Sequence, residues 1–306
     1  MSQPSFAPLI PRLERLLDRL EHLLDRQWAS HGQTEVFDSA IAFRWVRRDG
    51  QGRLEPIRHP DLFDLNDIIG FDHQIQLLIQ NTHQFVRGLP ANHVLLWGAR
   101  GTGKSSAVKG CLTRFAAEGL RMIEVHKSDL IDLPLILDLV WDRPERFIIF
   151  CDDLSFDEGE GVYRELKAIL EGGLTARPDN VLVYATSNRR HLMPERFQDN
   201  VPRIDGSGEI HPGEGVEEKI SFSDRFGLSL SFYSIDQKTY LQIVDHWAAR
   251  QGLHIDTDTL HRQALQWALR TSGRSGRVAR QFVDDLAGRL ALQAQDTGAL
   301  SSSNRP

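Results

Sequence analysis

Residues 98–106 read GARGTGKSS and place Gly98, Gly103, Lys104 and Ser105 in the pattern G-x-x-x-x-G-K-[ST]. Backbone N–H groups can wrap an anionic phosphate only where the turn is tight and largely free of Cβ atoms, which explains the glycines. An apolar run, HVLLW, precedes the loop, and a segment of helical character, SSAVKGCLTRFAAEG, follows it. The positive N-terminus of that helix would point at the same phosphate. This strand–loop–helix order predicts a nucleotide phosphate site in an α/β fold.

Each position of the loop has an expected role. Lys104 is expected to reach the β- and γ-phosphates, and the Ser105 hydroxyl is expected to ligate Mg²⁺. We expect the nucleotide to contact the whole loop, namely Gly98, Ala99, Arg100, Gly101, Thr102, Gly103, Lys104, Ser105 and Ser106.

A second acidic motif follows at FIIFCDD, where Asp152 lies 48 residues beyond Lys104 (152 − 104). The apolar run predicts a buried strand that ends at the two aspartates. Ligands of an open parallel sheet bind at the carboxyl ends of its strands. Asp152 is therefore the second expected Mg²⁺ residue, beside the bound triphosphate.

Strand and helix signals alternate over the middle of the chain. Apolar strands are expected at 93–98, 121–126, 146–151, 180–186 and 220–232, and helical periods at 104–118 and 160–171. Such alternation predicts a parallel sheet covered by helices on both faces.

The chain divides into four expected regions. Residues 1–60 form an N-terminal extension with a leucine-periodic helix and a β-hairpin at 40–58, and residues 61–233 form the nucleotide-binding α/β domain. Residues 234–296 form a small α-helical domain of three segments, and 297–306 form a flexible tail. The glycine- and acid-rich stretch 199–219 is expected to be a long mobile loop. The leucines of the first helix fit packing on its own domain and also fit a partner-binding helix.

Composition limits the class of protein. The net charge is 36 − 42 = −6, so the molecule as a whole does not attract nucleic acid, although a local basic patch could still do so. The two cysteines, Cys111 and Cys151, lie in apolar segments, which argues against a disulfide scaffold. No apolar run approaches the roughly 20 residues that a membrane span needs, and the N-terminus lacks a signal-peptide profile. We expect a cytoplasmic protein with no membrane contact.

Four segments resemble those of the AAA+ ATPases. DLFDLNDIIGFDHQIQ, within 61–88, is similar to the segment ahead of that family's phosphate loop, and the resemblance implies that Ile69 contacts adenine. VLVYATSNRR (181–190) is similar to the sensor 1 strand and implies that Asn188 orients the attacking water, with Thr186 and Ser187 as possible substitutes. SFSDRFG (221–227) and SGRSGRVARQFVDDL (272–286) resemble the arginine-finger and sensor 2 elements.

The resemblance implies roles for two arginines and an architecture. Arg225 would be the arginine finger at a subunit edge, in a homo-oligomer, and Arg277 the sensor 2 arginine, with Arg274 as the alternative. The fold would be an AAA+ core, that is, a P-loop NTPase parallel sheet with Walker A and Walker B motifs. A C-terminal α-helical lid and the N-terminal helix and hairpin extension would complete it.

A closer resemblance rests on the combination of four segments, LLWGARGTGKSSAVKG, FCDDLSF, ILEGGLTARPDNVLVYATSNRRHL and FSDRFG. These are similar to a bacterial group of stand-alone AAA+ ATPases catalogued as a domain of unknown function. The resemblance implies ATP and Mg²⁺ as cofactors and implies no substrate.

The second acid decides between hydrolysis and binding alone. Many AAA+ members carry Asp-Glu at this position, whereas this chain carries Asp152-Asp153, as replication initiators and helicase loaders do. Aspartate is one methylene shorter, roughly 1.5 Å, and displacements of that size can cost about a hundredfold in rate. Asp153 is the expected general base and Glu158 the second candidate, while Asp157, Glu158 and Glu160 also suit the start of a helix.

The predicted function is therefore a slow Mg²⁺-dependent ATPase that couples nucleotide state to oligomer assembly or partner remodelling. Two alternatives are a nucleotide-dependent binding module with little turnover and a small-molecule P-loop kinase. The substrate stays open. The sequence shows no basic stripe with aromatic residues for nucleic acid, and 126–145 holds no aromatic–glycine pore loop for protein substrates.

Overall fold

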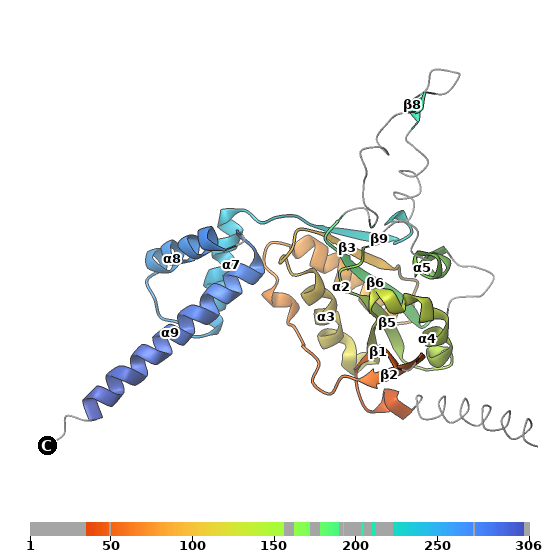
Figure 1. Ribbon diagram of the computed structural model, residues 1–306, viewed down its shortest axis with the longest axis horizontal. Coiled ribbons are helices and arrows are strands. Elements are labelled where there is room, and N and C mark those ends of the chain that lie inside the picture. Colours follow the sequence, from red (N-terminus) through yellow and green to blue (C-terminus); the bar gives the residue numbers. More distant parts are fainter. Residues whose placement is uncertain are drawn as a thin grey trace, which may run out of the picture.

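The computed structural model describes residues 35–48, 50–155, 162–171, 178–189, 192, 203–204, 210–211, 223–271 and 273–302. Seven strands form the main sheet in the order β2-β1-β4-β5-β6-β3-β9 (Figure 1). The strands are β1 Ala42–Arg48, β2 Gln51–Pro56, β3 Val94–Gly98, β4 Leu120–Glu124, β5 Arg146–Cys151, β6 Val181–Ser187 and β9 Leu228–Phe232. All neighbours pair in parallel except β1 and β2, which are antiparallel. A separate two-stranded sheet joins β7 Arg203–Ile204 to β8 Ile210–His211.

Helices cover both faces of the main sheet. They are α2 Asp72–Val86, α3 Lys104–Phe115, α4 Leu133–Val140 and α5 Val162–Glu171, with 3-10 turns η1 Glu35–Asp38, η2 Leu65–Asp67, η3 Ala116–Glu118 and η4 Lys127–Asp132. Strand β5 shows the two faces directly. Phe147, Ile149 and Cys151 pack in the cluster that holds residues of α4, whereas Ile148 and Phe150 pack in the cluster of α2 and α3. The alternation follows from the two-residue period of a strand, and it confirms the predicted α/β class.

The hairpin expected at 40–58 is present and continues the main sheet. Strand β1 pairs in parallel with β4, for example Phe43 opposite Ile123. Phe43 and Trp45 are buried, and the Trp45 Nε1 donates a hydrogen bond to Asp132 Oδ2 at 3.0 Å. The hairpin therefore contributes to the core of the sheet domain, although its sequence position suggested an extension.

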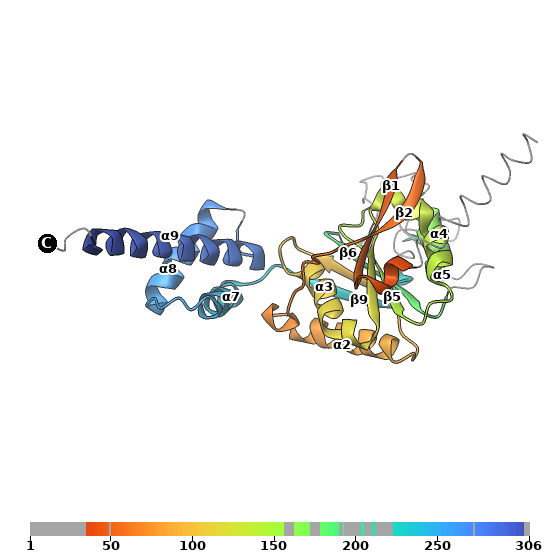
Figure 2. The ribbon, with the colours of Figure 1, turned by 90° about the horizontal axis from the view of Figure 1, so that it is seen from below.

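Three helices follow the sheet, α7 Gln237–Arg250, α8 Thr257–Arg270 and α9 Gly276–Ser302. They enclose their own apolar cluster, which includes Tyr240, Trp247 and Phe282. In both views this helical lid lies to one side of the sheet domain (Figures 1 and 2). Phe63 and Ile69, which precede α2, pack against the lid cluster and attach it to the core.

Two boundaries differ from the expected ones. The strand expected at 220–232 is shorter, because Ser223 and Asp224 are helical and β9 begins at Leu228. Serine, aspartate and glycine favour turns over strand interiors, which accounts for the late start. Helix α9 continues to Ser302, beyond the end expected at 296, and its last turns are rich in the helix formers alanine, leucine and glutamine.

Several sequence predictions lie outside the described residues. They are the leucine-periodic helix at 4–28, the acids Asp157, Glu158 and Glu160, and most of the loop at 199–219. Within the described ranges, no helix combines the length and apolar character needed to cross a membrane.

Both thiols are predicted to be unreactive in the folded protein. Burial raises the pKa of Cys111 and of Cys151 to about 12. Because the thiolate is the reactive species, iodoacetamide at about pH 8 should modify neither thiol in the native state and both after unfolding in guanidinium. Mass spectrometry of the intact protein measures the modification. Labelling of the native protein at the rate of the unfolded chain would contradict this packing.

Candidate functional site

Lys104 lies at the start of α3, directly after the loop that leaves β3. Its Nζ donates hydrogen bonds to the carbonyl oxygens of Gly98 at 2.9 Å and Ala99 at 2.7 Å, and to Asn188 Oδ1 at 3.2 Å. Burial lowers the pKa of Lys104, and the nearby carboxylates of Asp153 and Asp152 oppose that shift. The ammonium is thus held at the centre of the loop, where an anionic phosphate would favour its charged form.

The Asp152 carboxylate connects three elements. Its Oδ1 accepts hydrogen bonds from the Ser105 hydroxyl of α3 and from the Thr186 hydroxyl of β6, each at 2.6 Å. Ser105 and Asp152, the two residues expected to ligate a metal, therefore lie in direct contact. Oxygen donors of this kind suit a hard divalent cation. The described residues contain no group of three or more His, Cys, Asp or Glu side chains that could hold a metal by themselves.

Asp153 has an unusual backbone conformation. Its φ is +51°, a positive value that no other non-glycine residue of the described chain shares. Thr186 supports this conformation, because its hydroxyl accepts from the Asp153 N–H at 2.9 Å and its carbonyl accepts from the Leu154 N–H at 2.7 Å. Backbone strain of this type costs about 1–3 kcal/mol and persists where the surroundings enforce it, often at functional sites.

Asn188 links the expected base to the lysine. Its Nδ2 donates to Asp153 Oδ1 at 2.5 Å, while its Oδ1 accepts from Lys104. The residue after β6 thus holds one carboxylate and one ammonium at once. Any water bound at Asp153 would lie beside this amide.

These groups line a pocket of about 590 Å³ between the core and the lid. One part is polar and holds Arg100 to Ser106, Asp152, Asp153, Thr186 and Asn188. The other part is largely apolar, with Phe63, Ile68, Ile69 and Phe71 of the core and Ile235, Ile243 and Trp247 of the linker and α7. An apolar slot joined to a few converging polar groups is typical of a small-ligand site.

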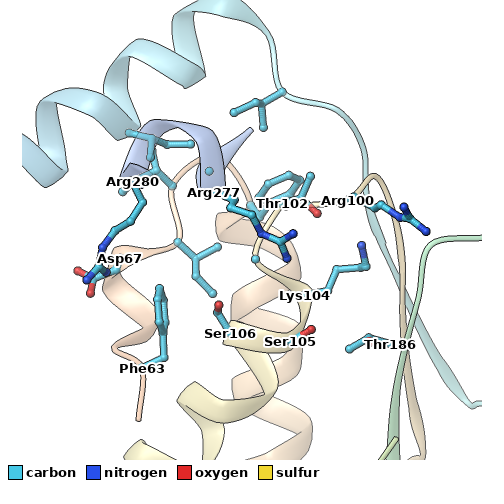
Figure 3. A pocket seen from close by; sticks show the side chains of 18 of the residues that line it. Phe63, Asp67, Arg100, Thr102, Lys104, Ser105, Ser106, Thr186, Arg277 and Arg280 are labelled. Atoms are coloured by element: carbon cyan, nitrogen blue, oxygen red, sulfur yellow. The ribbon is translucent and has the colours of Figure 1, made fainter. Parts of the chain in front are cut away.

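The lid reaches the loop through α9. The Arg277 N–H donates to the Gly101 carbonyl at 3.2 Å, and the Arg277 side chain lines the pocket beside Lys104 (Figure 3). Arg274 instead donates to Gln237 of α7 at 3.1 Å. Gly101 has a φ of +74°, and a Cβ there would lie 2.8 Å from the Ser275 hydroxyl, so only glycine allows this approach.

The structure places most of the predicted site residues together. Those lining the pocket are Ile69, Arg100, Gly101, Thr102, Gly103, Lys104, Ser105, Ser106, Asp152, Asp153, Asn188 and Arg277. Gly98 and Ala99 contribute their carbonyls to Lys104. Arg225 is partly exposed after the Ser223–Asp224 turn and is not among the lining residues of the described chain.

Sequence reasoning missed several residues of the pocket wall, among them Phe63, Asp67, Trp247 and Arg280. Phe63 and Asp67 belong to the segment before Ile69, so a search of that segment could have found them. Trp247 and Arg280 lie in helices whose sequence periodicity is the same whether the face packs in a core or lines a ligand pocket.

Thr186→Val is predicted to destabilise the folded protein by about 1–3 kcal/mol, because Asp152 loses a donor and the Asp153 N–H loses its acceptor. Thr186→Ser keeps both hydrogen bonds and is the matched control. Equilibrium unfolding in urea measures the difference. Equal stability of the valine and serine variants would show that the hydroxyl does not support Asp153.

Comparison with known protein families gives a match over most of the chain. The family described as "Protein of unknown function (DUF815)" matches residues 38–290. A search of curated proteins by sequence found no match.

Solved structures show the same fold. The RuvB Holliday junction branch migration motor of Thermotoga maritima has a TM-score of 0.53 and 17% identity over 76% of this chain. This chain covers 66% of that RuvB chain, just under two thirds of its length. A point mutant of the same motor gives a TM-score of 0.52 at 16% identity, covering 76% of this chain and 67% of that one. The FIGL-1 AAA domain in complex with ADP has a TM-score of 0.45, at 20% identity and 74% coverage of both chains. The chain, with its seven-stranded sheet and helical lid, shares the fold of that RuvB motor and belongs to the family described as DUF815.

Proposed function

We propose that this protein binds ATP with Mg²⁺, hydrolyses it slowly, and couples its nucleotide state to self-assembly or to the remodelling of a partner. The observation that carries the proposal is the hydrogen-bonded set of Lys104, Ser105, Asp152, Asp153 and Asn188 at one end of a pocket. The apolar slot at the other end, beside Ile69, has the character needed for a nucleobase.

The residues present fit a magnesium ion. Ser105 Oγ and Asp152 Oδ1 are hard oxygen donors in contact at the edge of the phosphate loop. Mg²⁺ in nucleotide sites takes one or two protein oxygens, and phosphate and water oxygens complete its shell. When bound, the ion would neutralise charge on the phosphates.

Asp153 is the proposed general base, with Lys104 and Arg277 as the cations beside the γ-phosphate. To accept a proton from water, the Asp153 carboxylate needs a free lone pair beside the Asn188 amide, which is already bonded to one of its oxygens. The short side chain and this pairing both favour slow turnover. They also favour the alternative function, a nucleotide-dependent binding module with little turnover, which shares the same site.

The Lys104→Ala variant should lose at least about a hundredfold in ATP affinity, because the buried ammonium is the cation at the centre of the loop. Lys109→Ala is the matched control, since Lys109 lies on the same helix and pairs with the exposed Asp61. Titration with a fluorescent ATP analogue measures both. Unchanged affinity of Lys104→Ala would remove the nucleotide assignment.

Asp153→Ala should retain ATP binding and lower phosphate release by about a hundredfold, the usual contribution of a general base. Asp179→Ala, a change at an exposed aspartate before β6, is the control. If parent and Asp153→Ala proteins release phosphate at the same rate, the binding-module alternative is favoured.

The oligomer contact is proposed to place Arg225 of one subunit at the pocket of the next. Arg225 does not line the pocket of its own chain in the described structure, as an arginine acting on a neighbouring subunit requires. Mixing equal amounts of Arg225→Ala and Asp153→Ala should restore about one quarter of the parent activity. Random assembly gives one site in four both an intact base and an intact neighbouring arginine. Activity no higher than that of either variant alone would contradict action between subunits.

A further inference from the structure

A charged contact joins the core to the lid at the wall of the pocket farther from Lys104. The Asp67 carboxylate of η2 accepts hydrogen bonds from His246 Nε2 at 2.8 Å and from the Arg250 guanidinium. Both donors belong to α7 of the lid, while the Asp67 side chain is 4% exposed. Among the residues that the structure describes, these two supply the side-chain hydrogen bonds to this carboxylate.

The burial of Asp67 makes this contact depend on the position of the lid. A carboxylate can be removed from water only where charged or hydrogen-bonding partners replace the water. Because the partners come from α7, moving the lid away would leave the charge unpaired or require it to be rehydrated. Removing one partner of a buried ion pair costs more free energy than the intact pair contributes to stability, because it leaves a buried charge without a partner. The seated lid and the buried carboxylate therefore stabilise each other.

Neighbouring contacts strengthen the same junction. The Trp247 ring packs edge-on to Phe63 of the core, with ring centroids 6.5 Å apart, and the Arg280 guanidinium of α9 lies 3.9 Å from the Trp247 centroid. Gly70, with a φ of +87°, lets the core backbone approach α7 so closely that a Cβ there would meet Thr239 Cγ2 at 2.5 Å. Asp67, Phe63, Trp247 and Arg280 all line the pocket.

The junction also determines where Arg277 lies. Figure 3 shows Arg277 and Arg280 descending from the same turn of the lid, Arg277 on the side of Lys104 and Arg280 on the side of Phe63 and Asp67. Because α7 and α9 pack in one apolar cluster, a change in the angle of α7 carries Arg277 with it. The lid thus contacts the core at Gly101 on one side of the pocket and at Asp67 on the other.

We propose that Asp67 is a positioning residue for nucleotide binding. Its carboxylate, through His246 and Arg250, holds the lid at the angle that keeps Arg277 over the phosphate loop. The effect on affinity rests on the proposed function, whereas the effect on lid position does not depend on any nucleotide.

The first measurement is the distance between core and lid without nucleotide. Spin labels at Leu89→Cys, after α2, and Leu269→Cys, on α8, report it, since these leucines are 56% and 87% exposed. The native cysteines are buried and should stay unlabelled. Asp67→Asn should broaden the distance distribution obtained by double electron–electron resonance. Asp245→Asn is the matched control, because Asp245 accepts a hydrogen bond from His261 at 2.7 Å, a contact of the same chemistry within the lid.

The second measurement is ATP affinity. If Asp67→Asn leaves about one tenth of the molecules with a seated lid, apparent affinity falls about tenfold, whereas Asp245→Asn should change it less than about twofold. Adding His246→Gln to Asp67→Asn should weaken binding no further, because both changes remove the same contact. A parent protein that binds no ATP would remove the proposed function, and the distance measurement would still decide the role of Asp67.

Specific outcomes would overturn the proposal. One is an Asp67→Asn distance distribution identical to that of the parent protein. Another is equal broadening in Asp245→Asn, which would assign the effect to the fold of the lid. If Asp67→Asn fails to fold, the single variant His246→Gln replaces it, since His246 is partly exposed and its loss removes one of the two donors. An unchanged distance distribution in that variant would equally reject the role.

Discussion

The hydrogen bonds to the Asp152 carboxylate fix the positions of the site residues relative to the strands of the sheet. Strand β5 delivers Asp152 to the carboxyl edge, Ser105 reaches it from the first turn of α3, and Thr186 reaches it from β6. The parallel pairing of β5 with β6 and of β6 with β3 sets the relative heights of these three residues. Thr186 then supports the positive φ of Asp153 with its hydroxyl and its carbonyl. Geometry at the expected base therefore depends on the registers of three strands.

Each end of the pocket holds a buried charged side chain that needs a partner from another element. Lys104 is buried and bonded to loop carbonyls and to Asn188, and Asp67 is buried and bonded to α7. Each charge is stable away from water only because another element supplies its partner. Ligand phosphates would add to the partners of Lys104, whereas Asp67 has its partners when the lid is seated. Under the proposed function, the Lys104 end would respond to the nucleotide and the Asp67 end to the lid.

The phosphate loop and the strands around it were predictable because their chemistry is local. A loop that wraps phosphate needs glycine and lysine in a fixed order. Acids at the end of a buried strand mark its carboxyl end, and therefore the edge of the sheet where ligands bind. The pairing of β1 with β4 was not predictable, because a short hairpin carries no local sign of its partner strand. The contact of Asp67 with His246 spans 179 residues, and neither sequence neighbourhood indicates it. Trp247 lies in a helical stripe where core packing and pocket lining have the same pattern.

The two attachments of the lid limit what can occupy the pocket. At Gly101 the contact is between backbones and needs a residue without Cβ, so it tolerates little change of angle. At Asp67 the contact is a side-chain pair whose energy depends on excluding water. A ligand between the two attachments must be thin enough to leave both contacts intact. Otherwise its own binding free energy must offset the loss of the contact that it breaks. The proposed ATP, with a flat base beside Ile69 and a charged chain at Lys104, would have its bulk between the attachments and would therefore meet the first condition.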